Sequence, residues 1–283
     1  MNFGYGLSRQ FSMNVGVPVV LDSHWSTKLA GTRYDQIAHG IGDVNVGLSF
    51  WLKNCERYPD KNISFGLNVR MPTGESNYQV LYPNSLGQDF RLRPVFPGIQ
   101  PGSGAWALRP SVDAFYQFSH FTMFGTATYA FALRDQNDTN PLGATLNPAG
   151  LSATVPGLRF ISTPDSYLVS IGVGAPVPKL SMLSAFVNLG DTGVPVHNVF
   201  GTTTGYRQPG HYTTLQPGIS WNTSLASFNV SLAIRLKAST DANFLGNPIS
   251  SDFTRYSVQL GMSFKLGGNA PAPPVATASS NAP

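Results

Sequence analysis

Residues that could carry acid–base or nucleophilic chemistry are few in this 283-residue chain, and they follow no catalytic spacing. The single cysteine, Cys55, can form neither an internal disulfide nor a cysteine-based metal site. The sequence contains neither a Gly-x-Ser-x-Gly nucleophile turn nor a His-Glu-x-x-His metal-binding pair. The histidines are His24, His39, His120, His197 and His211. We therefore expect no enzyme, no catalytic residue, no metal and no cofactor.

Charged residues on the polar side of alternating segments are the better functional candidates. Six are singled out: Arg70, Arg109, Arg235, Arg255, Asp43 and Asp113. If these segments line a pore, rings of such charges would set its ion selectivity. The alternative is that the charges pair with one another and stiffen the wall. Lys53, Lys237 and Lys265 would add positive potential.

Alternation with a period of two is the dominant pattern, and it predicts strands with two unlike faces. Residues 43–53 carry apolar side chains at every second position from Val44 to Leu52, with polar residues between them. Residues 62–71, 228–237 and 255–266 repeat this pattern. Weaker strands are predicted at residues 1–7, 11–20, 106–118, 121–133, 166–175, 180–189 and 211–222.

Three of the weaker strands contain a proline. Pro18, Pro110 and Pro217 cannot donate a backbone hydrogen bond, so we expect a bulge or a strand end at each.

Long and short connections alternate between these strands. The long ones are predicted at residues 22–40, 72–105, 134–165, 190–210 and 238–251. All of them therefore lie at one end of an up-and-down meander, which is the shape of a transmembrane β-barrel.

Alternation does not by itself reveal which face is inside, because a soluble β-protein gives the same pattern. Segments of about 10 residues suit strands that cross a bilayer. Ser, Asn, Gly and Thr dominate the polar face, as a water-filled lumen requires. Several aromatic residues lie near segment ends, where those on the outer face could form interfacial girdles. These features favour a membrane barrel over a soluble β-sandwich.

Composition supports this interpretation. Charged residues make up 11% of the chain, against roughly 25% in an ordinary soluble domain. The formal net charge is +4, but the cations are scattered and form no patch, so we expect no nucleic-acid partner. The sequence has no apolar run of about 18 residues, the length of a transmembrane helix.

Two motifs resemble a known family. One runs from Gly40 through a Gly-Asp-led strand, a polar turn and a second strand to Pro72-Thr73-Gly74-Glu75. The other is the opening segment from Phe3 to Met13. Both are similar to the outer-membrane β-barrel proteins named after the meta-pathway of phenol degradation. The corner Pro72, Thr73 and Gly74 has a structural explanation, with Gly74 expected at a positive φ.

The resemblance implies a porin-like channel in the outer membrane of a Gram-negative bacterium, for small solutes that include aromatic or apolar ones. It brings no catalytic residues. The expected partners are outer-membrane lipid and a small-molecule solute, and formation of a homo-oligomer stays open. Two alternatives also stay open: a structural or surface-binding barrel with a plugged lumen, and a soluble β-sandwich binding module.

About eleven strands can be counted, whereas bacterial single-chain barrels have an even number. We therefore expect a barrel of about twelve strands over residues 1–266, with its first strand and its export signal missing from this chain. Residues 267–283 are rich in Ala, Pro and Ser, and are expected to be a disordered tail.

Overall fold

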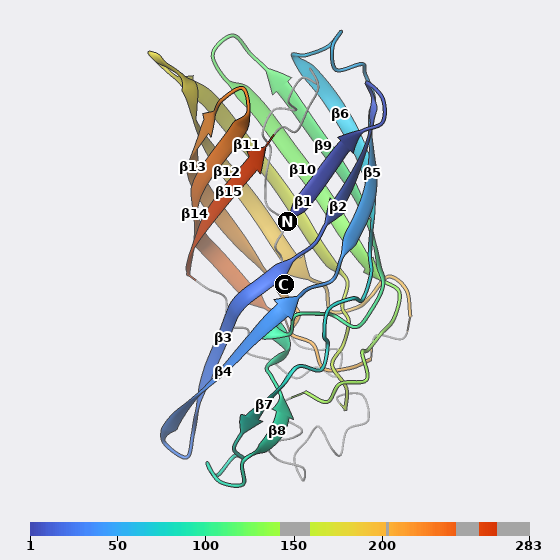
Figure 1. The fold of residues 1–283 in the computed structure, drawn as a ribbon, viewed down its shortest axis with the longest axis vertical. Helices are drawn as coiled ribbons and strands as arrows, with labels where there is room; N and C mark the ends of the chain where they lie inside the picture. The colour runs from blue at the N-terminus through green and yellow to red at the C-terminus, as the bar shows by residue number, and fades with distance from the viewer. Residues whose placement is uncertain (142–158, 202–203, 242–254, 265–283) are drawn as a thin grey trace.

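The computed structural model describes residues 1–141, 159–201, 204–241 and 255–264. Its main feature is one 11-stranded sheet, which curls into a barrel of tilted strands (Figure 1). Every pair of neighbouring strands is antiparallel, which confirms the predicted meander. Across the sheet the strands are β1 (Asn2–Gly6), β2 (Phe11–Gly16), β5 (Asn45–Trp51), β6 (Lys61–Arg70), β9 (Ala107–Gln117), β10 (Thr122–Ala132), β11 (Ser166–Val177), β12 (Leu180–Val194), β13 (Gly210–Asn222), β14 (Ala226–Thr240) and β15 (Tyr256–Phe264).

The connections between strands alternate in length, as predicted. Short turns join β1 to β2, β5 to β6, β9 to β10, β11 to β12 and β13 to β14. The longer connections all leave the opposite end of the barrel (Figure 1). In the part of the chain that is described, no helix is long and apolar enough to cross a membrane.

β1 and β15 are the two edges of the sheet. Both run from the long-loop end to the short-turn end, so a direct ladder between them would be parallel. No pairing between them is recorded among the described residues. A twelfth strand, antiparallel to both edges, therefore stays a prediction. The predicted tail, residues 267–283, lies outside the described residues.

Two segments that were predicted to be loops contain β-hairpins. β3 (Val19–Leu29) pairs with β4 (Thr32–Ile41), and β7 (Gln79–Tyr82) pairs with β8 (Arg91–Pro94). A 3₁₀ turn, η1 (Pro97–Ile99), follows β8. Figure 1 shows both hairpins projecting beyond the long-loop end of the barrel. We call the two hairpins and η1 together the loop-end arm.

The loop-end arm has a small core of its own. Ala38 on β4 packs with Val95 and Ile99 from the segment after β8. The ring of Trp25 on β3 stacks on Phe96 with 4.7 Å between ring centroids. This cluster is the apolar core of the described residues, and it lies outside the barrel.

Candidate functional site

The barrel strands turn their apolar face outward. The side chains of Phe65, Ile171, Val230 and Leu260 are each about half exposed or more. The described barrel strands bury no apolar side chain larger than alanine. A soluble β-sandwich would have the reverse arrangement, with apolar side chains packed between two sheets. The alternation therefore belongs to a membrane barrel, and the soluble alternative is wrong for this fold.

The other face of each strand lines the lumen and is mostly polar. Its side chains bond to neighbouring strands along the wall. Gln216 on β13 donates to the hydroxyl of Ser231 on β14 and to Oε1 of Gln259 on β15, both at 2.7 Å. At the other side of the sheet, the hydroxyls of Ser12 and Ser49 lie 2.6 Å apart. These bonds fix polar side chains against the wall of the barrel.

The predicted lumen charges gather mainly on β6 and β9. Arg70 and Arg109 share the inward face of these two adjacent strands, and Asp113 lies on the same face of β9. Nε of Arg70 is 3.8 Å from Oδ2 of Asp43, which is nearly buried just before β5. The structure thus places these four residues on one stretch of wall.

The other two predicted arginines lie apart from this group. Arg235 is on β14, with the parity of the inward-facing Ser231. Arg255 lies one residue before β15 and is exposed, with its guanidinium carbon 5.4 Å from the ring centre of the outward-facing Tyr256. A common arginine ring at the long-loop mouth is therefore not formed by all four residues.

The Pro-Thr-Gly corner ties the β6 exit to the start of β5. Thr73 Oγ1 accepts the Val44 N–H at 2.8 Å and donates to the Gly42 carbonyl at 3.2 Å. Asp43 accepts the Gly74 N–H at 3.0 Å and the Ser103 N–H at 2.9 Å. The structural role of Pro72, Thr73 and Gly74 therefore has a clear hydrogen-bond basis.

The expected positive φ at Gly74 is wrong, because Gly74 is absent from the left-handed glycines of the chain. Its reason is close approach. A Cβ on Gly74 would lie 2.7 Å from Cα of Gly102 and 3.0 Å from its nitrogen. Glycine is needed here for space between two backbone segments.

Sequence reasoning placed only Trp51 among the inward-facing aromatic residues. Besides Tyr212 of β13 at the long-loop end, four aromatic side chains face the lumen in the described strands. They are Trp51 on β5, Phe115 on β9, Phe124 on β10 and Phe186 on β12. The rings of Trp51 and Phe115 meet edge to face with 5.8 Å between centroids. Strand parity could also have found Phe115, Phe124 and Phe186, since each falls on the polar side of its strand. They form an apolar stripe toward the short-turn half of a polar wall.

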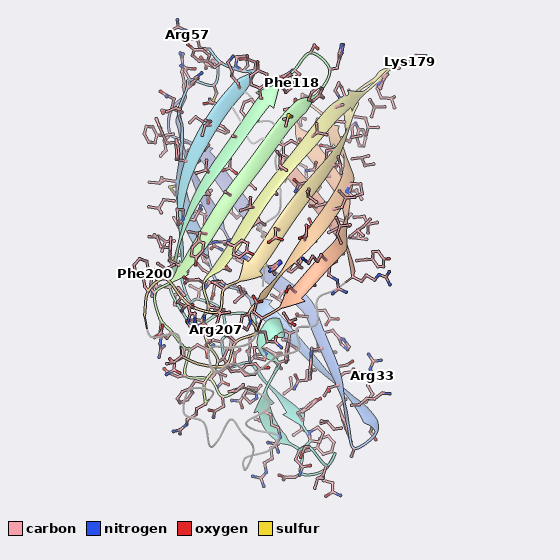
Figure 2. The ribbon with its side chains drawn as sticks, turned by 180° about the vertical axis from the view of Figure 1, so that it is seen from behind. Arg33, Arg57, Phe118, Lys179, Phe200 and Arg207 are labelled. Atoms are coloured by element: carbon pink, nitrogen blue, oxygen red, sulfur yellow. The ribbon has the colours of Figure 1, made fainter. Side chains whose placement is uncertain are left out.

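The outward aromatics near strand ends fit the predicted girdles better. Tyr116 and Phe118 contact at 4.6 Å, and Tyr129 and Phe131 do the same at the other end of the barrel. Figure 2 shows Phe118 at the short-turn end together with Arg57 and Lys179.

A hydrogen-bond network anchors two long loops at the rim. Buried Asp165 accepts the N–H groups of Ala132 and Val199, both at 2.8 Å, and the Tyr129 hydroxyl at 3.1 Å. Asn198 Oδ1 accepts the Asp165 N–H at 3.0 Å and Nη1 of Arg207 at 2.9 Å. Burial lowers the pKa of Arg207, and the charges of Asp165 and Asp135 partly oppose this effect. Arg207 lies at the loop end of the barrel, whereas Lys179 lies at the short-turn end (Figure 2).

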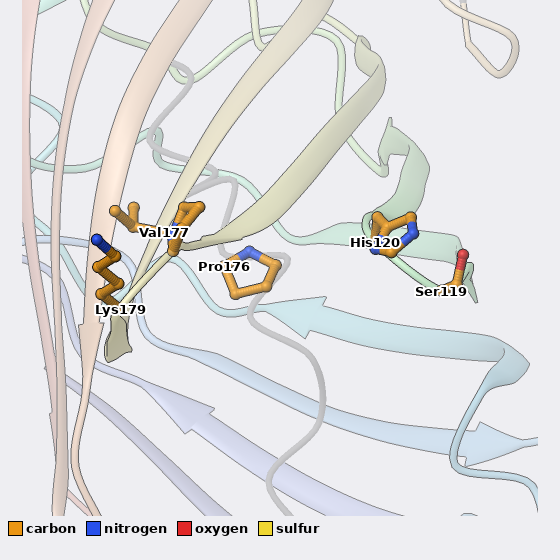
Figure 3. Close-up of a pocket in the computed structure, with 6 residues that line it drawn as sticks. Ser119, His120, Pro176, Val177 and Lys179 are labelled. Carbon is orange, nitrogen blue, oxygen red and sulfur yellow. The ribbon is translucent and has the colours of Figure 1, made fainter.

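A cavity of about 550 Å³ lies at the short-turn end. Its lining consists of Ser119 and His120 from the β9–β10 turn, and residues 176–179 from the β11–β12 turn (Figure 3). None of its lining residues is acidic. His24 and His39 lie on the loop-end arm, so His120 is remote from both.

Groups of three His, Cys, Asp or Glu side chains that could hold a metal do not occur in the described ranges. Cys55 lies in the β5–β6 turn, where burial raises the pKa of its thiol. Its sulfur accepts a bond from Nδ2 of Asn62 at 3.6 Å.

Comparison with known proteins gives a structural relative. No family model and no curated protein matches the chain. The fold is similar to the crystal structure of the COG4313 outer membrane channel from Pseudomonas putida F1, with a TM-score of 0.52 and 11% sequence identity. The alignment covers 92% of this chain and 79% of that one. The chain therefore has the fold of an up-and-down antiparallel transmembrane β-barrel, with long loops at one end and short turns at the other.

Proposed function

We infer that the protein is a passive channel of the bacterial outer membrane for small solutes. One observation carries this proposal: the barrel is apolar outside and mostly polar inside, and its described strands form no apolar core between the walls. An outward apolar face suits lipid, and a polar inner face suits water. The similar fold of an outer membrane channel supports the same conclusion.

The lumen wall suggests which solutes pass. Trp51, Phe115, Phe124 and Phe186 expose rings on a mostly polar surface. Flat apolar molecules gain from contact with aromatic rings, which remove their apolar surface from water. We therefore propose that aromatic or apolar compounds are among the solutes, as the family resemblance also implies.

Conductance of the purified full chain in a planar bilayer tests the channel. We expect discrete conductance steps from heat-modifiable, folded protein, and none from protein denatured before addition. Swelling of loaded liposomes in solutions of neutral solutes then measures passage without an electric field. Folded protein that neither conducts nor swells liposomes would overturn the proposal.

The loop-end arm favours a second candidate, a barrel whose outer face binds a partner. Leu81 and Leu92 form an exposed cross-strand pair on this arm, and Leu86 and Phe90 are exposed beside them. A folded chain without conductance would leave this candidate as the better one. Removal of the β7–β8 hairpin, which carries these four residues, would then abolish binding to whole cells or their surface polymers.

A further inference from the structure

Phe124 lies where the missing side chain of a glycine would be. On the inward face, Phe124 of β10 pairs with Gly172 of β11. A Cβ built on Gly172 would lie 2.5 Å from Cε2 of Phe124 and closer still to the ring tip. It would also lie 2.9 Å from the Val187 carbonyl oxygen. The ring of Phe124 therefore occupies the space above a bare stretch of backbone.

Phe186 repeats this arrangement two strands further along the sheet. Phe186 of β12 pairs with Gly218 of β13. A Cβ on Gly218 would lie 2.8 Å from Cε1 of Phe186 and 2.8 Å from Cβ of Ser231. Between the two rings, a Cβ on Gly174 would lie 3.4 Å from Phe186 and 3.8 Å from Phe124. Both rings thus lean the same way, each onto the next strand.

Two other inward-facing glycines, Gly190 and Gly261, have no ring above them. A Cβ on Gly190 would meet only Ser170, Thr214 and a carbonyl oxygen, at 3.5 Å or more. A Cβ on Gly261 would meet Asn229 at 3.6 Å. These are ordinary contact distances, so alanine fits at both positions. They provide matched controls on the same face of the same sheet.

We propose that Phe124 and Phe186 are the residues that set the bore of the lumen and contact passing solutes. Gly172 and Gly218 are positioning residues that hold the two rings against the wall. This inference rests on the proposed channel function and adds a size-selecting element to it.

The physical reason is steric. Side chains occupy a few staggered rotamers, and the rotamer over the glycine is lost once a Cβ stands there. The backbone of the sheet blocks movement outward, so the ring must turn toward the lumen. A methyl group on Gly218 meets only side-chain atoms at close range, so it narrows the passage by turning the ring. A methyl group on Gly172 has the same effect and also presses on the Val187 carbonyl, so Gly218→Ala is the cleaner test. Removal of the ring instead widens the passage.

The test compares five variants of the full chain with the native protein. They are Gly172→Ala, Gly218→Ala, Phe186→Ala, the double variant Gly218→Ala with Phe186→Ala, and the control Gly261→Ala. Heat-modifiability on gels establishes that each is folded. Single-channel conductance and liposome swelling with neutral solutes of graded size measure the bore.

We expect Gly172→Ala and Gly218→Ala to reduce swelling severalfold for the largest solute that the native channel passes, with less effect on the smallest. Phe186→Ala should extend passage to larger solutes, and the double variant should regain at least native swelling. Gly261→Ala should match the native protein. A merely structural role for the glycines would not give this rescue by removal of a ring.

Each outcome decides the question. Swelling rates of the glycine variants equal to that of Gly261→Ala, or a double variant that does not regain native swelling, would overturn the role of the glycines. Conductance of the native protein would still support the channel function in that case. If Gly218→Ala fails to fold, Phe186→Ala decides, because an unchanged size limit in this variant would show that its ring does not set the bore. A folded native chain without conductance overturns the channel and the bore together.

Discussion

At the scale of single residues, buried polar atoms decide what the loops and the arm can tolerate. Tyr82 on β7 is 1% exposed, and its hydroxyl has no hydrogen-bond partner among the described residues. A buried hydroxyl without a hydrogen bond lowers the stability of the fold, so Tyr82 must be held in place by packing of its aromatic ring. Its neighbour Tyr34 meets the ring edge to face at 6.1 Å.

This environment makes the arm sensitive to alkali. Burial, with the charges of Asp35 and Tyr34, raises the pKa of Tyr82 to about 12, from 10.0. The folded arm thus favours the neutral phenol, and this stabilisation is complete below pH 10 and is lost as the pH rises to about 12. We expect the arm to open in that range, and Tyr82→Phe to remove this transition. Trp25 lies in the arm, so its fluorescence, obtained as the difference between chains with and without Trp25, is followed against pH. An alkaline transition at the same pH in Tyr82→Phe would show that Tyr82 does not cause it.

Asp43 is the second residue whose loss should be costly. It accepts three hydrogen bonds, from the Gly74 N–H, the Ser103 N–H and the Ser103 hydroxyl. Asp43→Ala leaves two amide groups without an acceptor, at a cost of about 1–3 kcal/mol for each one that stays buried. The measurement is the temperature at which the folded band is lost on gels. Asp43→Asn keeps one acceptor oxygen, so its unfolding temperature should lie between those of the native chain and Asp43→Ala. Equal unfolding temperatures for all three proteins would refute the stabilising role of Asp43 at the corner.

These residues also show what sequence could and could not predict. The pattern around Asp43 and Thr73 predicted a corner, because proline and glycine at a strand end have local causes. The reason for Gly74 was missed, because its contact with Gly102 joins segments far apart in the chain. The packing of the Phe124 ring over Gly172 was missed for the same reason, since these two residues meet only through the register of β10 and β11.

At the scale of elements, alternation in the sequence was enough to predict the barrel strands, but it did not predict the two hairpins of the loop-end arm. β3 and β4 mix polar and apolar residues on both faces, since only one end of their hairpin packs on the arm's core. Their two-residue turn has positive φ at Ala30 (47°) and Gly31 (86°). Such turns usually carry Asn-Gly or Asp-Gly. The sequence therefore lacked both the periodicity and the turn signal.

Prolines within strands behaved differently from the prediction. Pro18 follows the end of β2, as expected. Pro110 and Pro217 lie inside β9 and β13 without a register shift at either position. Each keeps its pairing with one neighbouring strand, to Leu67 and Val187 respectively, while pairing with the other strand is interrupted there. Loss of one donor thus weakens one ladder and makes no bulge.

The outward face of a central strand gives an element-scale prediction. Ile171 lies near the middle of β11 and is 54% exposed. In a bilayer its side chain would face hydrocarbon, so Ile171→Arg should destabilise the folded barrel by about 2–4 kcal/mol. Thr126→Arg, on the inward face of the adjacent β10, is the control and should cost much less. Urea unfolding in lipid vesicles measures both, and a larger cost for Thr126→Arg would reverse the assignment of the faces.

At the scale of the whole molecule, the lumen charges should give the channel a preference for anions. Arg70 and Arg109 lie on adjacent strands of one wall, with Asp113 on the same face. Asp43 and Asp113 offset the formal charges of Arg70 and Arg109, and Arg235 on the inward face of β14 leaves this set of lumen charges net positive. Interior charges act strongly on permeating ions because the surrounding barrel and lipid have a low dielectric constant.

The reversal potential across a salt gradient measures this preference. Replacing Arg70 and Arg109 together with serine should shift it toward cations, because the remaining wall carries Asp113 without its neighbouring cations. Arg255→Ser is the comparison: Arg255 lies opposite Arg235 at the loop-end mouth, its guanidinium lies over the outward-facing Tyr256, and its loss should shift the potential less. A reversal potential that moves with Arg255 and not with the β6–β9 pair would place the selectivity at the loop-end rim. Increasing salt should weaken the native preference, because mobile ions screen the wall charges.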